Sequence, residues 1–244
     1  VKLIKKKYNY SWEKEGKEIC TQINNNPNNL DKKKLKEVIR KAVLNYQIKG
    51  EEIPSLIDET YNYQVIMFFE VELNSIKSAT YVNNLLQKEV IKAPCIFKFY
   101  DVSSCCYAFA DKRLSMQEEN VVVIDSTFVT TPQPNNAEVD SRLLYANIKN
   151  KNNKRSFYTE LMVKTYVLNN SKLIQDITTV FDTHIWYDET KKMEFYYKLR
   201  ELQSLKDKQA KTVVAQEKVE LNTKMKKLIE EIRNYYKGND SDNR

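Results

Sequence analysis

The strongest periodicity in the chain lies near its end, between Glu189 and Lys237. Apolar residues recur there at three- and four-residue spacing, the period of an amphipathic helix, and charged residues fill the other positions. A polar patch at 206–212 divides the apolar residues into two seams without a glycine or proline. We therefore predict a charged helical arm over 189–237, either one long helix of coiled-coil type or a helical hairpin. We favour the hairpin, because its seams would bury each other.

The seams also supply candidates for a partner interface, since an apolar stripe on a helix must be covered by another surface. The interface candidates are Leu199, Leu202, Leu221, Met225, Leu228 and Ile232. Phe195 and Leu205 complete the first seam, and Ile229 and Tyr236 complete the second.

The first half of the chain alternates between helical and strand periods. Residues 30–49 carry apolar side chains at helical spacing and predict one helix that ends at Gly50. A second helix is predicted over 76–92, before Pro94. Runs rich in β-branched and aromatic residues predict four strands, at 61–73, 93–102, 105–114 and 121–131. The resulting fold class is α+β, with a small, mostly antiparallel sheet and flanking helices over residues 31–132.

The remaining residues divide by composition. Residues 1–30 are a basic, Asn-rich segment, and residues 133–188 are predicted to be a linker with short helices, including a mobile basic loop at 149–155. Residues 238–244 are predicted to be a disordered tail. No apolar run approaches the roughly 18 residues that a membrane helix needs, and the first residues lack a secretory pattern. We therefore expect a cytoplasmic protein that does not enter a membrane.

Missing residue types argue against several enzyme classes. Glycine occurs only at 16, 50 and 238, so the glycine-rich loops that cradle phosphates are absent. His184 is the only histidine, which leaves no two-histidine metal site and no nucleophile elbow beside it. The four cysteines, Cys20, Cys95, Cys105 and Cys106, lack zinc or dithiol spacing. We lean towards a non-enzyme and expect no cofactor.

A metal-dependent nuclease is the alternative. Such enzymes hold Mg²⁺ with strand-borne carboxylates near a lysine. Glu70 and Glu72 alternate on one face of a predicted strand, Asp125 lies on another, and Lys112 lies near the end of a third. Mg²⁺ would be a cofactor under this alternative alone. The competing interpretation is that the two glutamates form the solvent face of a half-buried strand.

The net charge of +7 permits contact with DNA or RNA, although lysines and glutamates alternate along much of the chain. Basic residues at a strand end and in the 149–155 loop would bind phosphates with little sequence preference. These candidates are Lys112, Arg113, Lys149, Lys151, Lys154 and Arg155. Solvated loops explain the same residues equally well.

Several segments together resemble an uncharacterised bacterial family, domain of unknown function 4391. They are YQVIMFFEVEL, VIKAPCIFKFYD, ADKRLS, VVVIDSTFVTT and EKVELNTKMKKLIEEI, and the similarity covers roughly residues 35–236. The family has no assigned activity to transfer. Its members tend to be encoded beside helicases and DNA methyltransferases, which implies an accessory role in restriction or phage defence.

These observations together predict a non-enzymatic accessory subunit of a bacterial DNA-processing or phage-defence system. The α+β core would dock or contact nucleic acid, with Lys112 and Arg113 on its rim. The arm would engage a protein partner, namely a helicase, a methyltransferase or a second copy of the chain.

Overall fold

The structure, a computed structural model, describes residues 29–118 and 121–237. It forms two compact units. Of the described residues, unit 1 comprises 29–118, 121–145 and 151–158, and unit 2 comprises 146–150 and 159–237. Residues 133–145, the first part of the segment 133–188 predicted to be a linker with short helices, are grouped with unit 1. The tail at 238–244, Cys20 and nearly all of the basic N-terminal segment lie outside the described residues.

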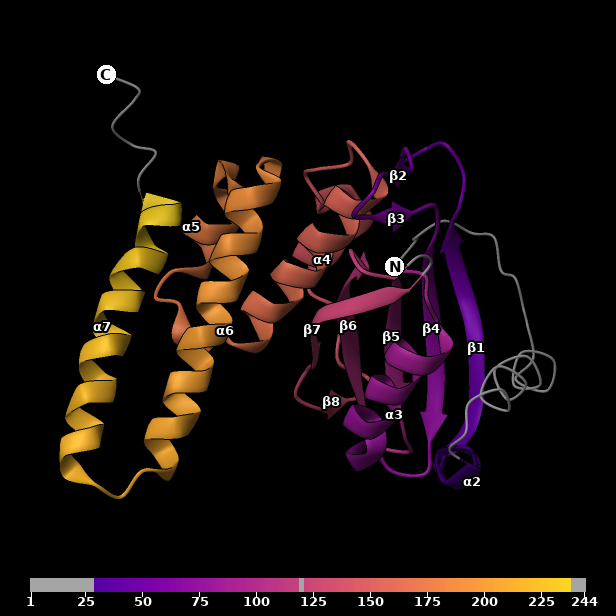
Figure 1. Cartoon of the computed structure of the whole chain (residues 1–244), viewed down its shortest axis with the longest axis horizontal. Helices are drawn as coiled ribbons and strands as arrows, with labels where there is room; N and C mark the ends of the chain where they lie inside the picture. Colours follow the sequence, from indigo (N-terminus) through magenta and orange to yellow (C-terminus); the bar gives the residue numbers. More distant parts are fainter. Residues whose placement is uncertain (1–28, 119–120, 238–244) are drawn as a thin grey trace. The chain divides into compact units, whose positions relative to one another are not determined.

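Unit 1 is built on a mixed sheet in which β1 (Ile39–Ile48), β4 (Ile66–Leu73), β5 (Cys95–Tyr100), β6 (Ser104–Leu114) and β7 (Val122–Val129) follow one another (Figure 1). Only β4 and β5 pair in parallel, and the short β8 (Gln133–Pro134) pairs with β6. A separate two-stranded ribbon joins β2 (Leu56–Ile57) to β3 (Asn62–Tyr63). The predicted α+β class with a mostly antiparallel sheet is confirmed.

The single helix predicted over 30–49 is wrong in its second half. The helix α2 (Asn29–Val38) is followed directly by β1, which pairs antiparallel with β4. The pairing shifts register between Ile39 and Lys41 and again between Leu44 and Tyr46. Each irregularity displaces the side-chain alternation by one residue. The buried positions 39, 42, 44 and 48 therefore do not follow the strict alternation of a strand, and their uneven spacing explains the wrong prediction of a helix.

One face of the sheet is covered by a short helical segment, which confirms the helix predicted over 76–92. It begins with η1 (Ile76–Ser78), continues as α3 (Ala79–Leu85) and ends in the π-type turn η2 (Leu86–Val90). Its apolar residues pack with those of β4 and β5, and the rings of Phe69, Phe97 and Phe99 stack at centroid distances of 5.3 Å. Burial of this face gives unit 1 its core.

Unit 2 is helical. The 3₁₀ turn η3 (Ser141–Leu143) still belongs to unit 1, and η4 (Tyr145–Asn147) begins there and ends in unit 2. Helix α4 (Lys154–Asn169) follows, with its first turn counted with unit 1. The turn η5 (Ser171–Leu173), α5 (Ile177–Asp182) and the turn η6 (His184–Tyr187) follow. The arm then forms α6 (Glu189–Lys211) and α7 (Ala215–Lys237). No helix in the described ranges is both long enough and apolar enough to cross a membrane.

The arm is a hairpin, as the two apolar seams predict. Figure 1 shows α6 and α7 side by side and joined by a short turn. Lys198 contacts Glu231 at 2.6 Å, whereas Gln209 donates to Asn222 at 2.5 Å, so the helices run antiparallel. The turn falls at residues 212–214 and begins at the last residue of the polar patch.

Candidate functional site

The base of the hairpin belongs to the core of unit 2. Phe195, Tyr196, Leu199 and Leu202 on α6 are at most 2 % exposed, and the ring of Tyr196 meets that of Tyr166 edge-on at 5.1 Å. Deletion of the whole arm would therefore remove part of the hydrophobic core of unit 2.

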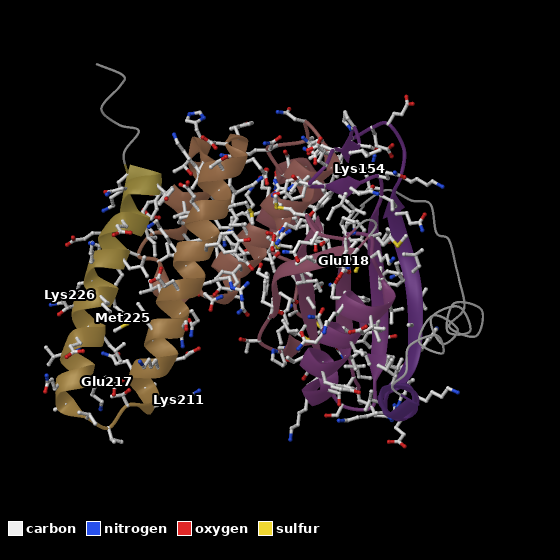
Figure 2. The ribbon with its side chains drawn as sticks, viewed as in Figure 1. Glu118, Lys154, Lys211, Glu217, Met225 and Lys226 are labelled. Carbon is white, nitrogen blue, oxygen red and sulfur yellow. The ribbon has the colours of Figure 1, made fainter. Side chains whose placement is uncertain are left out.

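The distal half of the hairpin, residues 203–227, is packed differently. Only Leu221 is buried within this fully described stretch. The two helices are joined there by the hydrogen bond from Gln209 to Asn222 and by Lys208 and Glu217, which lie 3.4 Å apart. Figure 2 shows Met225 on the side of α7 that faces α6, and Lys226 on the opposite side. The distal half thus leaves most of its surface exposed.

Three valines are exposed close to the turn. Val213 is 90 % exposed, Val214 is 55 % exposed and Val219 is 64 % exposed. Exposed lysines flank them at positions 211 and 218. We call residues 211–219 the apex. The distal half contains seven lysines and three acidic residues, a net charge of +4.

The interface candidates named from the sequence are used within the hairpin itself. Leu199, Leu202, Leu221, Leu228 and Ile232 are at most 7 % exposed, and Met225 is half-buried. The exposed apolar residues are instead Val213, Val214 and Val219, which helical periodicity missed because they lie outside both seams. The sequence signal that could have identified them is the Val-Val pair at 213–214, because a connection between two helices usually consists of polar residues.

Lys112 does not lie on the rim of the sheet as expected. It is 2 % exposed, and its ammonium donates to the carbonyl oxygens of Ile91 and, at 3.1 Å, of Ala93. Burial lowers the pKa of Lys112, and burial raises the pKa of the adjacent Cys95 thiol. Lys112 therefore ties β6 to the segment that follows η2 and is withdrawn from solvent.

Two residues of the expected basic loop are also internal. Lys154 is 1 % exposed and donates to Gly50 O at 3.0 Å, Ile53 O at 2.8 Å and Ser55 Oγ at 3.0 Å. Arg155 is 7 % exposed and lies 3.8 Å over the ring of Tyr61. Both belong to the first turn of α4, so the loop ends before Lys154 and is shorter than the predicted 149–155.

The other basic candidates are partly exposed. The backbone N–H of Lys149 donates to Glu160, and Lys151 lies 4.9 Å over the ring of Tyr145. Arg113 donates to both carboxylate oxygens of Asp125, at 2.9 and 3.0 Å. Both bonds come from the single Nε–H of Arg113, and a guanidinium paired with a carboxylate in this way has less of its charge available to a phosphate.

The carboxylates of the nuclease alternative are separated by the sheet order. Glu70 and Glu72 lie on β4, whereas Asp125 lies on β7, and β5 and β6 run between them. At the usual strand spacing this separates the groups by about 14 Å. Each glutamate also has a cation beside it at 3.7 Å, Lys98 for Glu70 and Arg40 for Glu72. Across the described ranges, no three metal-ligating side chains of His, Cys, Asp or Glu gather to hold an ion.

A groove of about 750 Å³ opens in unit 2 between η6, α6 and α7. Its carboxylates are engaged: Glu231 with Lys198 at 2.6 Å, and Glu194 as acceptor from the Tyr235 hydroxyl at 3.0 Å. The hydrogen bond to Glu231 raises the pKa of Lys198, and the bond from Lys198 lowers the pKa of Glu231. His184 lies at the edge of the groove, with the ring of Tyr187 at 6.2 Å.

A buried ion pair that could not be predicted from residue spacing lies inside unit 2. Glu160 and Lys164, one turn apart on α4, are 0 % and 1 % exposed and lie 2.5 Å apart. The carboxylate of Glu160 also accepts from the backbone N–H groups of Lys149 and Asn150, at 2.8 and 2.7 Å. The pair fixes the connecting segment 147–150 against α4.

Comparison with known proteins gives a family and no activity. A model of the family described as a domain of unknown function, DUF4391, matches residues 22–232. No curated protein and no solved structure matched the chain. Because the match extends from α2 to the last turns of α7, it takes in the sheet and the whole hairpin turn. The chain belongs to the DUF4391 family.

Proposed function

We propose that this chain is a non-enzymatic accessory subunit whose hairpin binds another protein. The observation that carries the proposal is the distal half, residues 203–227, which buries one side chain of its own yet presents three exposed valines and a net charge of +4. Exposed apolar residues that gather together, rimmed by polar ones, are characteristic of interaction sites.

The placement of the chemically reactive residues also favours binding over catalysis. Glu70, Glu72 and Asp125 are spread across the sheet and have cationic neighbours. Lys112 is enclosed by backbone carbonyls. A catalytic centre requires such groups to converge on one reacting atom. No observation of this kind supports the nuclease alternative.

The setting of the proposal follows from the family resemblance. An accessory subunit of a restriction or phage-defence system would bind a helicase, a DNA methyltransferase or a second copy of itself. DNA or RNA would be a further contact of the exposed lysines, with a salt dependence set by the number of phosphates neutralised.

The test shortens the hairpin without disturbing its base. The antiparallel register places Leu202 level with Leu228, and both are buried. Residues 203–227 are therefore replaced by a short Gly-Ser turn, and circular dichroism verifies that the variant remains folded. Tagged full-length and shortened proteins are then each expressed in, and purified from, the cells that naturally produce the full-length protein. We expect the full-length protein to retain a specific partner and the shortened protein to lose it.

Equal recovery of the same partner by both proteins would overturn the proposal. Deletion of the whole arm is not a valid test, because it would remove Phe195, Tyr196 and Leu199 from the core of unit 2. A control variant, Val102→Asp, introduces a charge at an 88 % exposed valine of unit 1 and should leave partner recovery unchanged.

A further inference from the structure

The apex combines two features that a solvated turn does not need. Val213 and Val214 occupy a three-residue connection in which neither is shielded, and Val219 follows on the first turns of α7. Lys211 and Lys218 lie on either side of the two turn valines in the chain and are exposed. The apex is therefore an exposed segment with three valines and two exposed lysines, in which Glu217 lies 3.4 Å from Lys208.

We infer that the apex inserts into an apolar pocket of a partner protein whose rim carries aspartate and glutamate side chains. The inference rests on the proposed function, that the hairpin binds a protein, and adds which residues enter the partner and what chemistry receives them. The valines would fill the pocket, and the lysines would face the acidic rim. Opposite charges at the rim steer association, whereas the desolvated centre holds the complex together.

The charge of the distal half argues against a second copy of the chain as the occupant. In a symmetric dimer the same patch contacts itself. Two apices in contact would bring together two distal halves, each of net charge +4, and their lysines would repel. An acidic partner removes that conflict.

The apolar content of the apex argues against a membrane and against nucleic acid. The three valine side chains together carry about nine aliphatic carbons, fewer than the roughly fourteen of a myristoyl chain, which alone gives only marginal membrane binding. Phosphates would engage the lysines but would leave the valines in water, because backbone contacts to nucleic acid are made by polar donors. A protein pocket with an acidic rim covers the valines and also pairs with the lysines.

The test places a photoreactive amino acid at position 213 of the full-length protein in cells that naturally produce it. Cross-linked peptides are identified by mass spectrometry, and the partner so found is purified. Its affinity is then measured by titration calorimetry against wild type, Val213→Ala, Val214→Ala and Lys211→Glu. Because truncating a buried valine removes two methyl groups, we expect each alanine variant to weaken binding about tenfold. Lys211→Glu should weaken binding and also reduce its dependence on salt.

Matched controls separate the apex from general effects. Val102→Ala removes the same atoms from a valine of the same exposure in unit 1, and Lys77→Glu makes the same charge change at an exposed lysine of η1. Both should bind like wild type. In the cross-linking experiment, the inference is overturned by a cross-link to a second copy of this chain, to lipid or to nucleic acid, or by the absence of any cross-link. In the affinity measurement, it is overturned if the valine variants bind the partner as tightly as their control does. If the shortened hairpin loses its partner while the apex variants keep it, the proposed function stands and the apex is not the contact.

Discussion

Replacing Glu160 by glutamine should destabilise unit 2 strongly, because the change leaves a buried ammonium without its counter-charge. Glu160 is fully buried, 2.5 Å from Lys164, and accepts two backbone hydrogen bonds from Lys149 and Asn150. The glutamine amide keeps one acceptor oxygen and introduces an NH₂ group among these donors. Lys164 would retain its hydrogen bond to Asn147 O at 3.1 Å.

The magnitude follows from the burial of both partners. Removing one member of a buried ion pair costs about 3–5 kcal/mol. For a unit of roughly 90 residues, each kcal/mol lowers the unfolding temperature by about 4–8 °C. The unfolding temperature of unit 2 should therefore fall by at least about 12 °C, measured by circular dichroism at 222 nm on the full-length protein.

The matched control is Glu231→Gln. Glu231 makes the same kind of contact with Lys198, at 2.6 Å, but the two side chains are 37 % and 31 % exposed. Water can replace the lost partner there, so only a slight fall is expected. A large fall for Glu160→Gln and a slight one for Glu231→Gln would support the account. Equal falls would show that burial of the ion pair does not set the loss of stability.

Three further substitutions test unit 1. Lys112→Ala should lower the free energy of unfolding by about 2–4 kcal/mol in urea titrations, because two buried carbonyls lose their donor. A loss near zero would contradict the buried position of the Lys112 ammonium. Tyr158→Phe should lower the free energy of unfolding by about 1–3 kcal/mol in the same assay, because the Tyr158 hydroxyl contacts Cys95 O at 3.1 Å and Ala110 O at 2.8 Å. An unchanged midpoint of urea unfolding would show that these hydrogen bonds contribute nothing. Hydrogen bonds from the backbone N–H of Ile76, Ser103 and Ser104 hold the pKa of Asp101 below its ordinary value of 3.8, so its contribution is present above that value and lost as pH falls through the lower, folded-state pKa. The stability difference between wild type and Asp101→Asn should accordingly shrink below about pH 3.8, and a difference that is constant down to pH 2 would contradict that shift.

The sheet and the hairpin could be predicted because their local patterns agree with the fold. The strands β5, β6 and β7 are apolar runs between turn residues, and the hairpin seams keep one helical period for several turns. Strand β1 could not be predicted, because two register shifts against β4 disguise its alternation. Such irregularities depend on the neighbouring strand, which lies some 25 residues further along the chain, and local spacing does not report them.

The basic residues show why charge alone does not predict a binding surface. Lys112 and Lys154 look like surface residues in the sequence, yet each donates to backbone carbonyls in the interior of unit 1. A lysine can be buried when several carbonyl acceptors converge on its ammonium, and that convergence is a property of tertiary structure. Conversely, Val213 and Val214 are apolar but exposed, because the turn between α6 and α7 leaves no surface to cover them.

The most direct test of the central claim, that the hairpin is where this protein binds its partner, is a quantitative co-purification. Full-length protein and the variant lacking residues 203–227 are labelled with different isotopes, purified side by side, and compared for the amount of partner recovered. We expect at least a tenfold excess of partner with the full-length protein, which corresponds to a loss of about 1.4 kcal/mol or more of binding free energy in the variant. Equal recovery from two folded proteins would contradict it.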